Sequence, residues 1–403
     1  MEDGVSEAMK GLLNPQYKKG LPSAGKALVD PGSLDQAFRF HQSFPQYSPT
    51  PLRRLAALAS HWGVADLFVK DESFRFGLNA FKVLGATYAI GQVLSHRLGL
   101  SLDELPFAKL KDPAIKKKLG SLTFAATTDG NHGRGVAWTA AQLGFPATIF
   151  MPHGTTLNRL DNIRRLGQKA EITGMNYDDT VRWVASQAQK NGWEVIQDTA
   201  WEGYVDVPGW IMQGYSTVVR ETLDQLQGVV PTHVFLQAGV GAFAAMMAAQ
   251  LLEHYGPSGP RVIILEAMPA ECFYESIRLG RKTAVTGDLN TIMAGLACGE
   301  PNPLAWDILK DCGFAFLAAP NEVAAHGMRV LGNPLAGDER IVSGESGAIG
   351  PGVLGWLTQK AEYADLKQSL GVGPDSRILC FSTEGDTDPK VYREIVWQGA
   401  FHE

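Results

Sequence analysis

The chain has 403 residues but only four cysteines, Cys272, Cys298, Cys312 and Cys380, and no two of them have CxxC spacing. So few cysteines argue against a disulfide scaffold and against a cysteine-based zinc site, and they indicate a reducing compartment. The N-terminus also lacks the basic flank and apolar core of a secretory signal. We therefore expect a cytoplasmic protein without a bound metal. Whether Cys272 and Cys298 pair depends on how the chain folds.

An excess of basic residues is also absent, because the net charge is −6 and the pI is near 5.9. This composition gives no electrostatic footprint for nucleic acid. One segment, residues 234–252, is nearly free of charge and about long enough to cross a membrane. Two glutamines and the small-residue turn "AGVGA" interrupt it, so we predict a buried strand, a loop and a helix there, and no membrane partner.

The chain is rich in short apolar runs that alternate with longer helix-like segments, which is typical of a parallel α/β fold. Hydrophobic residues make up 45% and charged residues 19%, as in a globular protein. There is no internal repeat or low-complexity linker, so two domains would be interleaved with a site in the cleft between them. The predicted strands are residues 66–72, 121–128, 147–152, 170–175, 193–199, 232–238, 261–267, 315–319, 339–345 and 377–384. The predicted helices include residues 79–99, 156–167, 177–192 and 352–371.

Lys82 lies near the start of a predicted helix, between Phe81 and the apolar pair Val83 and Leu84. Apolar surroundings disfavour the charged form of a lysine and lower its pKa, which suits a Schiff-base nucleophile. The alternative is a lysine at the edge of a helix with its ammonium in water.

Two glycine-containing loops connect predicted strands to helices and are candidate anion sites. The first, "TTDGNHGRG" (residues 127–135), carries Asp129, itself an anion, in its middle. The second, "QAGVGAFAA" (residues 237–245), also approximates the dinucleotide fingerprint GxGxxA, with Glu266 at the end of the next strand. An NAD-dependent dehydrogenase is therefore an alternative, although it leaves Lys82 and the Asp129 loop unexplained.

Four motifs, "AFKVLGA", "TTDGNHGRG", "AGVGA" and "STEGDTD", occur in the order and spacing of a known family. The chain resembles the pyridoxal-phosphate (PLP) enzymes of fold type II, which include threonine and serine dehydratases. It resembles the diaminopropionate ammonia-lyases more closely, because residue 129 is Asp where the dehydratases typically have Ser, and because of "DTAWEGY", "MNYDDTVRW" and "SGESGAIGPG". The resemblance covers nearly the whole chain. It implies two interleaved parallel-sheet α/β domains with PLP in the cleft, a large domain of residues 1–95 and 200–403, a small domain of residues 96–199, and a homodimer.

The resemblance also implies roles for residues that match the motifs. Lys82 would bind PLP covalently, and Asn131 would face its 3′-oxygen. Thr383, or less favourably Ser382, would meet the pyridine nitrogen. The backbone of the second loop would hold the phosphate, although Val240 and Ala242 interrupt the run of glycines common in the dehydratases: Gly239, Val240, Gly241, Ala242 and Phe243. The first loop would bind the substrate carboxylate: Thr128, Gly130, His132 and Gly133.

The implied reaction is the α,β-elimination of 2,3-diaminopropionate, as either the D- or the L-isomer, to pyruvate and two ammonia. Lys82 would remove the α-proton of the L-isomer and Asp129 that of the D-isomer. Asp198 would protonate the leaving amine or bind the distal ammonium of the substrate, with an N-cap as its structural alternative. Two further alternatives share the fold: a threonine or serine dehydratase, for which Ser would be expected at position 129, and a binding protein, which would lack a working Lys82.

Overall fold

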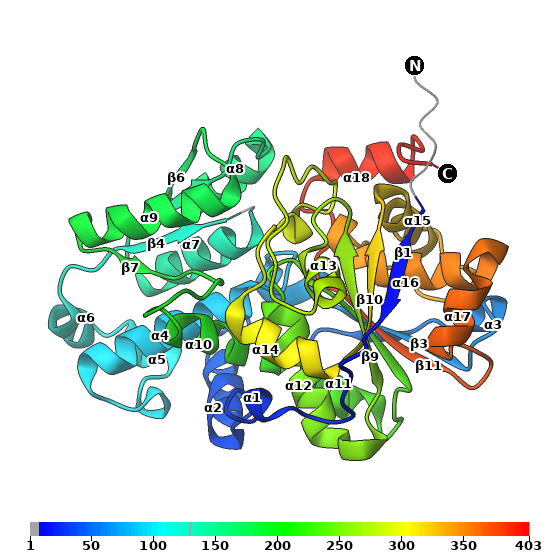
Figure 1. Cartoon of the computed structure of the whole chain (residues 1–403). Coiled ribbons are helices and arrows are strands. Elements are labelled where there is room, and N and C mark those ends of the chain that lie inside the picture. The colour runs from blue at the N-terminus through cyan, green and yellow to red at the C-terminus, as the bar shows by residue number, and fades with distance from the viewer. Residues whose placement is uncertain (1–7, 129, 403) are drawn as a thin grey trace.

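The computed structural model of the chain describes residues 8–128 and 130–402 and contains two β-sheets (Figure 1). In the larger sheet five central strands run parallel, and a short antiparallel strand closes each edge. A fold in which helices connect parallel strands buries those strands on both faces. The strand order is β1 (Lys10–Leu13), β10 (Gly313–Ala319), β9 (Arg261–Ala267), β8 (His233–Gln237), β11 (Arg377–Ser382), β3 (Asp66–Asp71) and β2 (Leu52–Arg54).

The smaller sheet has four parallel strands in the order β6 (Lys169–Ile172), β5 (Ala147–Met151), β4 (Phe124–Thr127) and β7 (Glu194–Val195). All of them fall within the predicted small domain of residues 96–199, and every strand of the larger sheet falls outside it. The chain therefore enters the smaller sheet after β3 and returns to the larger sheet at β8. The domain boundaries themselves remain a prediction.

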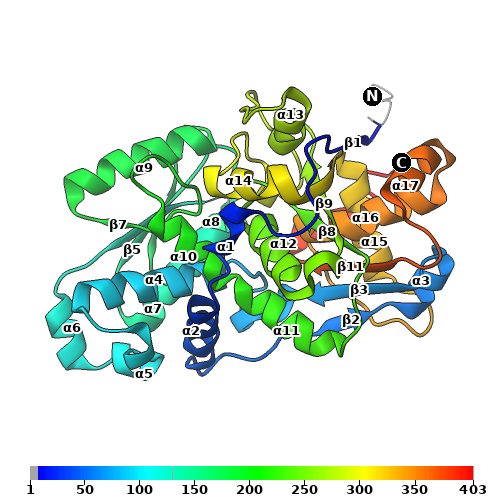
Figure 2. The ribbon, with the colours of Figure 1, turned by 60° about the horizontal axis from the view of Figure 1, so that its bottom comes forward.

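Helices cover both faces of each sheet, because successive side chains of a strand point to opposite faces. In β8, Val234 and Leu236 belong to one apolar cluster with helices α11 and α12, while Phe235 belongs to a second cluster with α15 and α16 (Figure 2). In the smaller sheet, α7 and α9 pack on opposite faces in the same way. The first cluster continues from the larger sheet to the smaller one, so the two sheets share a core.

Helix α4 packs on both α7, which follows a strand of the smaller sheet, and α10, which precedes the return of the chain to the larger sheet. It therefore connects the helices of the two sheets. The α-helices before the smaller sheet are α1 (Ser23–Lys26), α2 (Pro31–Gln42), α3 (Ala56–His61), α4 (Val83–Leu98), α5 (Phe107–Leu110) and α6 (Pro113–Leu119). Those among its strands are α7 (Asn131–Leu143), α8 (Leu157–Arg164) and α9 (Tyr177–Asn191). The remaining α-helices are α10 (Asp206–Gly214), α11 (Ser216–Leu226), α12 (Ala242–Tyr255), α13 (Cys272–Leu279), α14 (Pro303–Cys312), α15 (Asn321–Gly332), α16 (Glu345–Gln359), α17 (Ala364–Leu370) and α18 (Pro389–Val396). The 3-10 helices are η1 (Glu72–Gly77), η2 (Leu102–Glu104), η3 (Gly256–Ser258), η4 (Ala294–Leu296) and η5 (Ala361–Tyr363).

The predicted α/β fold with two parallel-type sheets is confirmed, and residues 234–252 form a strand, a turn and a helix as predicted. Two local expectations were wrong. Residues 339–344 run without a strand partner and lead into α16, and the predicted helix of residues 352–371 is divided near Lys360 into α16, η5 and α17. The edge strands β1 and β2 were not predicted, because such short strands carry too few residues for an alternating pattern to be recognised.

Candidate active site

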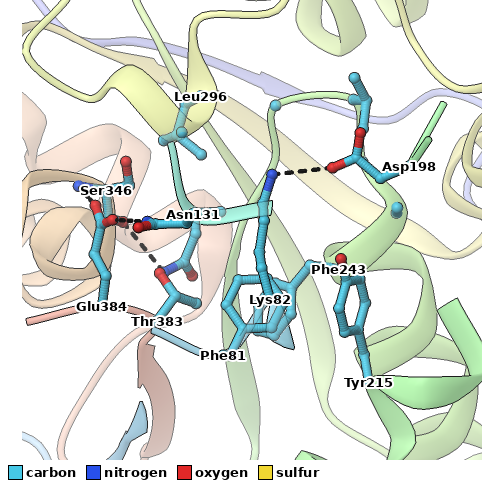
Figure 3. A pocket seen from close by; sticks show the side chains of 16 residues that line it. Phe81, Lys82, Asn131, Asp198, Tyr215, Phe243, Leu296, Ser346, Thr383 and Glu384 are labelled. Atoms are coloured by element: carbon cyan, nitrogen blue, oxygen red, sulfur yellow. Dashed lines mark hydrogen bonds and ion pairs between the residues drawn. The ribbon is translucent and has the colours of Figure 1, made fainter. Parts of the chain in front are cut away.

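The predicted functional segments meet at the carboxyl ends of β4, β8 and β11, where ligands bind in open α/β sheets. A narrow pocket there is lined by Lys82, Asn131, Asp198, Thr383 and residues 239–243 (Figure 3). It joins a wider cavity of about 710 Å³ at Lys82, Asp198 and Val240. The two glycine loops, far apart in the sequence, thus border one continuous site.

Lys82 is the residue that precedes α4, and its side chain is 17% exposed. The segment that leads to it follows β3 through η1 and bends at Asn79, whose φ is 58°. The Phe81 N–H then donates to the Thr383 carbonyl over 3.1 Å, which ties this segment to the end of β11. Lys82 Nζ lies 3.0 Å from Asp198 Oδ2, so the structure brings together two predicted catalytic residues that are 116 positions apart.

Asp198 is buried and bound on both carboxylate oxygens. Lys82 contacts Oδ2, while the Tyr177 hydroxyl donates to Oδ1 over 3.1 Å and Gln197 Nε2 donates to the same oxygen over 3.2 Å. Burial would raise the pKa of Asp198, but the charges of Lys82 and His132 outweigh it and lower the pKa to about 2. No helix begins directly after Asp198 in the described chain, so the N-cap alternative was wrong.

The second glycine loop forms the N-terminus of α12, a helix of 14 residues. The first N–H groups of a helix have no carbonyl one turn earlier to bind, and the helix dipole favours an anion beside them. Gly241 has a φ of 87°, which an L side chain rarely adopts, and a Cβ added at Gly239 would lie 2.8 Å from the Gly295 carbonyl oxygen. These glycines allow the backbone of residues 239–243 to curve around an anion the size of a phosphate.

The structure separates the two hydroxyls at the end of β11. Thr383 lines the narrow pocket, and its Oγ1 accepts a hydrogen bond from Gln237 Nε2 over 3.1 Å. Ser382 is fully buried and donates instead to Ser343 Oγ over 2.8 Å. Of the two predicted partners for a ring nitrogen, Thr383 is therefore the one that faces the pocket.

Asp129 lies outside the described residues, but its neighbours in the first loop are placed. The Thr128 hydroxyl oxygen accepts hydrogen bonds from the N–H groups of Gly130, at 2.8 Å, and Gly133, at 2.9 Å. These two N–H groups thus already donate hydrogen bonds within the loop. For them to bind a substrate carboxylate, their hydrogen bonds to the Thr128 hydroxyl must break. The side chain of His132 is buried and its Nε2 donates to the Ile196 carbonyl over 2.7 Å, so its predicted substrate contact is limited to the backbone.

Glu266 does not fit the role that a dehydrogenase requires of it. Its carboxylate is fully buried and accepts hydrogen bonds, each of 2.7 Å, from the N–H groups of Phe273 and Tyr274 in the first turn of α13. Burial raises its pKa to about 8 despite these bonds. A carboxyl group that caps a helix from inside the core is not available to a ribose hydroxyl, so the dehydrogenase alternative was wrong.

All four cysteines are free thiols. Burial raises the pKa of Cys272, and Glu266 and Cys298 raise it further, so the two cysteines are near one another but not bonded. Within residues 8–128 and 130–402, no three His, Cys, Asp or Glu side chains are grouped to hold a metal ion. Over the same ranges no helix combines the length and apolar character of a membrane span.

Several residues of the narrow pocket were not predicted from the sequence, namely Tyr215, Gln237, Ser346 and Glu384. The "SGESGA" and "STEGD" motifs carried the only sequence signal for the last two, and that signal did not specify which side chain would face the site. Gln237 is the last residue of the apolar strand β8 and donates to the Phe381 carbonyl over 2.8 Å as well as to Thr383, so it holds the end of β11 beside β8.

Comparisons with known proteins agree with this geometry. A family model described as "Pyridoxal-phosphate dependent enzyme" matches residues 44–383. A diaminopropionate ammonia-lyase of Escherichia coli (strain K12) is 53% identical over 365 residues, which is 90% of this chain and 91% of that relative. The crystal structure of the E. coli enzyme in complex with an aminoacrylate–PLP azomethine reaction intermediate matches with a TM-score of 0.91 and 47% identity, over 99% of this chain and all of that one. Its complex with D-serine matches with a TM-score of 0.92 and 48% identity, over 98% of each chain.

Proposed function

Since this chain belongs to the pyridoxal-phosphate-dependent enzyme family, we propose that it is an ammonia-lyase that converts D- and L-2,3-diaminopropionate to pyruvate and two ammonia. The observation that carries the proposal is the ion pair of Lys82 and Asp198 at the point where the narrow pocket meets the wider cavity. It places an amine nucleophile and an anionic group for a cationic substrate within 3.0 Å of each other.

The residues of the narrow pocket fit PLP. Lys82 supplies the amine, and the N-terminus of α12 with its glycine curve suits the phosphate. Thr383 presents a hydroxyl from the end of β11, and Asn131 presents a side-chain amide from the start of α7. With PLP bound, the Thr383 hydroxyl would be the group that meets the ring nitrogen. A hydroxyl would not hold that nitrogen protonated as a carboxylate would, which would favour prompt loss of a β-leaving group over transamination.

When bound, PLP supplies an electron sink for the charge left at the substrate α-carbon. Lys82 Nζ takes the α-proton of the L-isomer, and Asp129 takes that of the D-isomer from the opposite side. Asp129 is two residues before Asn131 in the sequence, and Asn131 lines the same pocket as Lys82, which supports this assignment. The N–H groups of the first loop orient the substrate carboxylate.

Asp198 is better suited to bind the β-ammonium of the substrate than to donate a proton to it. Its lowered pKa keeps it anionic at neutral pH, and a carboxylate can only accept hydrogen bonds. The β-amino group of the substrate arrives as an ammonium. When its C–N bond breaks, the bonding electrons stay on nitrogen and neutral ammonia leaves, so no additional acid is needed. Aminoacrylate, once released, hydrolyses to pyruvate and the second ammonia.

Pyruvate release measured separately from D- and L-diaminopropionate, serine and threonine tests the proposed substrate. Turnover of both diaminopropionate isomers ahead of the hydroxy amino acids is expected, whereas preference for threonine or serine would support a dehydratase. Borohydride reduction followed by peptide mapping tests the cofactor site, and we expect a pyridoxyl group on Lys82. A pyridoxyl group on another lysine, or on none, would refute the assignment.

Replacing Asp129 with asparagine tests its role for the D-isomer. We expect D-diaminopropionate turnover to fall by about 10²- to 10⁴-fold, the usual contribution of a general base, while L-isomer turnover stays within about tenfold. The measurement is kcat/KM for each isomer. Equal losses for both isomers would contradict the assignment of the two bases to opposite faces.

Replacing Asp198 with asparagine tests the ammonium contact. We expect kcat/KM for diaminopropionate to fall by roughly 10- to 100-fold, because a buried ion pair becomes a neutral contact. Turnover of serine should fall much less, because its β-substituent is an uncharged hydroxyl. Asp224→Asn, at an exposed position of α11, is the matched control. A similar loss for serine would show that Asp198 acts on a step common to both substrates.

We also propose that the protein is a homodimer that works in the cytoplasm, as its low cysteine content and the family suggest. Sedimentation velocity at micromolar concentration tests the first point, and a monomer would contradict it.

A further inference from the structure

Glu384 lies in the turn after β11, directly after Thr383, and its carboxylate faces the narrow pocket (Figure 3). It is only 3% exposed. A buried carboxylate is costly unless hydrogen-bond donors surround it. Neither the proposed chemistry nor the phosphate loop uses this group, so its burial next to the cofactor pocket needs another reason.

Two donors from different elements bind the two oxygens of Glu384. Asn131 Nδ2, at the start of α7, donates to Oε2, and the Ser346 N–H, in the first turn of α16, donates to Oε1 over 3.2 Å. The first contact joins the smaller sheet to the larger one at the edge of the pocket, because α7 follows β4 and Glu384 follows β11.

The surrounding backbone is shaped for this side chain. A Cβ added at Gly344 would lie 2.9 Å from Glu384 Cγ, and a Cβ added at Gly347 would lie 3.1 Å from the Glu384 carbonyl oxygen. The Gly344 N–H donates to that carbonyl over 2.9 Å. The glycines of the "SGESGA" motif thus leave space for Glu384. The proposed function alone does not explain why this motif contains glycines.

A second buried carboxyl group lies beside Glu384. Glu345, the first residue of α16, is 4% exposed and lines the wider cavity. Burial, followed by the charge of Glu384, raises the pKa of Glu345 to about 7, and Arg159 partly opposes this. Both hydrogen-bond partners of Glu384 are donors, which is what a carboxylate requires.

The chemistry of the Asn131 amide explains what Glu384 does. The oxygen and nitrogen of an asparagine side chain are nearly equal in size, so sterics alone permit either orientation. A carboxylate accepts hydrogen bonds and cannot donate them, so Glu384 selects the orientation in which Nδ2 faces it. The amide nitrogen carries two hydrogens and is able to serve a second anionic oxygen at the same time.

We infer that Glu384 is a positioning residue that orients the Asn131 amide, so that its N–H groups rather than its oxygen are presented to the 3′-oxygen of PLP. This inference rests on the proposed binding of PLP at Lys82. It adds a carboxylate that does not itself contact the reacting atoms but determines how the small-domain loop contacts the cofactor. The charge of Glu384 is needed, because a glutamine there could donate to Asn131 Oδ1 and stabilise the opposite orientation.

A double-mutant cycle on Glu384 and Asn131 tests the inference. The variants are Glu384→Gln, Asn131→Ala and the double variant. Apoenzyme prepared from each holoenzyme is titrated with PLP by fluorescence, and the pH midpoint of the visible absorbance change of the bound cofactor is recorded. We expect E384Q to weaken PLP binding by roughly tenfold or more, as for loss of a hydrogen bond to a charged group, and to move the midpoint. In the N131A background, E384Q should have no further effect on either quantity.

Glu345→Gln is the matched control, because it removes a second buried carboxyl group at the same place without removing a partner of Asn131. Its effect should add to that of N131A. If N131A does not fold, Asn131→Ser replaces it in the cycle. Additive effects of E384Q and N131A, or unchanged PLP binding in E384Q, would overturn the inference. The cycle measures PLP binding and does not depend on substrate. If the Glu384 and Asn131 variants are coupled in PLP binding but the wild type releases no pyruvate, the proposed reaction is refuted and the inference about Glu384 stands.

Discussion

Replacing Lys82 with alanine should abolish pyruvate formation from both isomers of diaminopropionate, with a loss of about 10⁴-fold or more, because one side chain acts as nucleophile and base. The same change should destabilise the protein, since Asp198 is buried against the Lys82 ammonium. Leaving one partner of a buried ion pair without the other is expensive. Activity is measured by pyruvate release and stability by urea unfolding.

Lys82→Arg separates the two effects. A guanidinium keeps a positive charge beside Asp198 but stays protonated, so it does not act as a nucleophile or a base. We expect K82R to be as inactive as K82A and yet more stable. Lys18→Ala, at a side chain that is 73% exposed, is the control and should change neither quantity. Substantial turnover by K82R would show that Lys82 acts only through its charge.

Replacing Arg75 with methionine should cost about 3–5 kcal/mol of unfolding free energy, the usual result of breaking a buried ion pair. Arg75 is 1% exposed and binds both carboxylate oxygens of Glu221, each over 2.8 Å, and both of Glu72, each over 2.9 Å. Lys70 Nζ also binds Glu221, over 2.8 Å. Without Arg75, one buried ammonium remains for two buried carboxylates.

The four charged groups, Lys70, Glu72, Arg75 and Glu221, also stabilise the turn that leads to Lys82, because Glu72 and Arg75 lie in η1. The R75M variant should therefore also lose PLP affinity. Glu72→Gln added to R75M should recover part of the stability, because it removes the excess charge. Arg278→Met, which breaks an exposed ion pair with Glu275, should cost far less than R75M. Equal costs for R75M and R278M would contradict the argument.

The cost of R75M should also depend on pH. Burial raises the pKa of Glu221, but Arg75 outweighs it and lowers the pKa to about 2. The stability that this carboxylate contributes is thus fully present above the unfolded pKa, near 4.5, and is lost as the pH falls towards 2. Urea unfolding at pH 4 and at pH 7 should therefore show a smaller difference between wild type and R75M at the lower pH.

Local patterns in the sequence were sufficient for most of the fold. Apolar runs predicted every parallel strand of the two sheets, though not the antiparallel edge strands β1 and β2. Glycine C-caps at Gly99 and Gly192, with φ values of 62° and 66°, ended α4 and α9 where expected. The prediction of a strand at residues 339–345 was wrong, because an apolar pattern indicates that a segment is buried but not whether another strand lies beside it to form hydrogen bonds. Ile341, Ser343 and Gly344 are buried beside the end of β11 in a segment that leads into α16, whereas Glu339 and Arg340 are exposed.

The sequence by itself determined the chemistry that the site contains: an amine among apolar residues, two glycine loops that follow strands, and a hydroxyl at a strand end. Each of these depends on neighbours within a few residues, so a single sequence reveals it. Only the tertiary structure decided which groups meet. Asp198 faces Lys82 across 116 residues, Glu266 turns into the core to cap α13, and Glu384 reaches Asn131 across 253 residues. Such contacts depend on which strands lie side by side and on the space that glycines leave between them, and neither is visible in local sequence patterns.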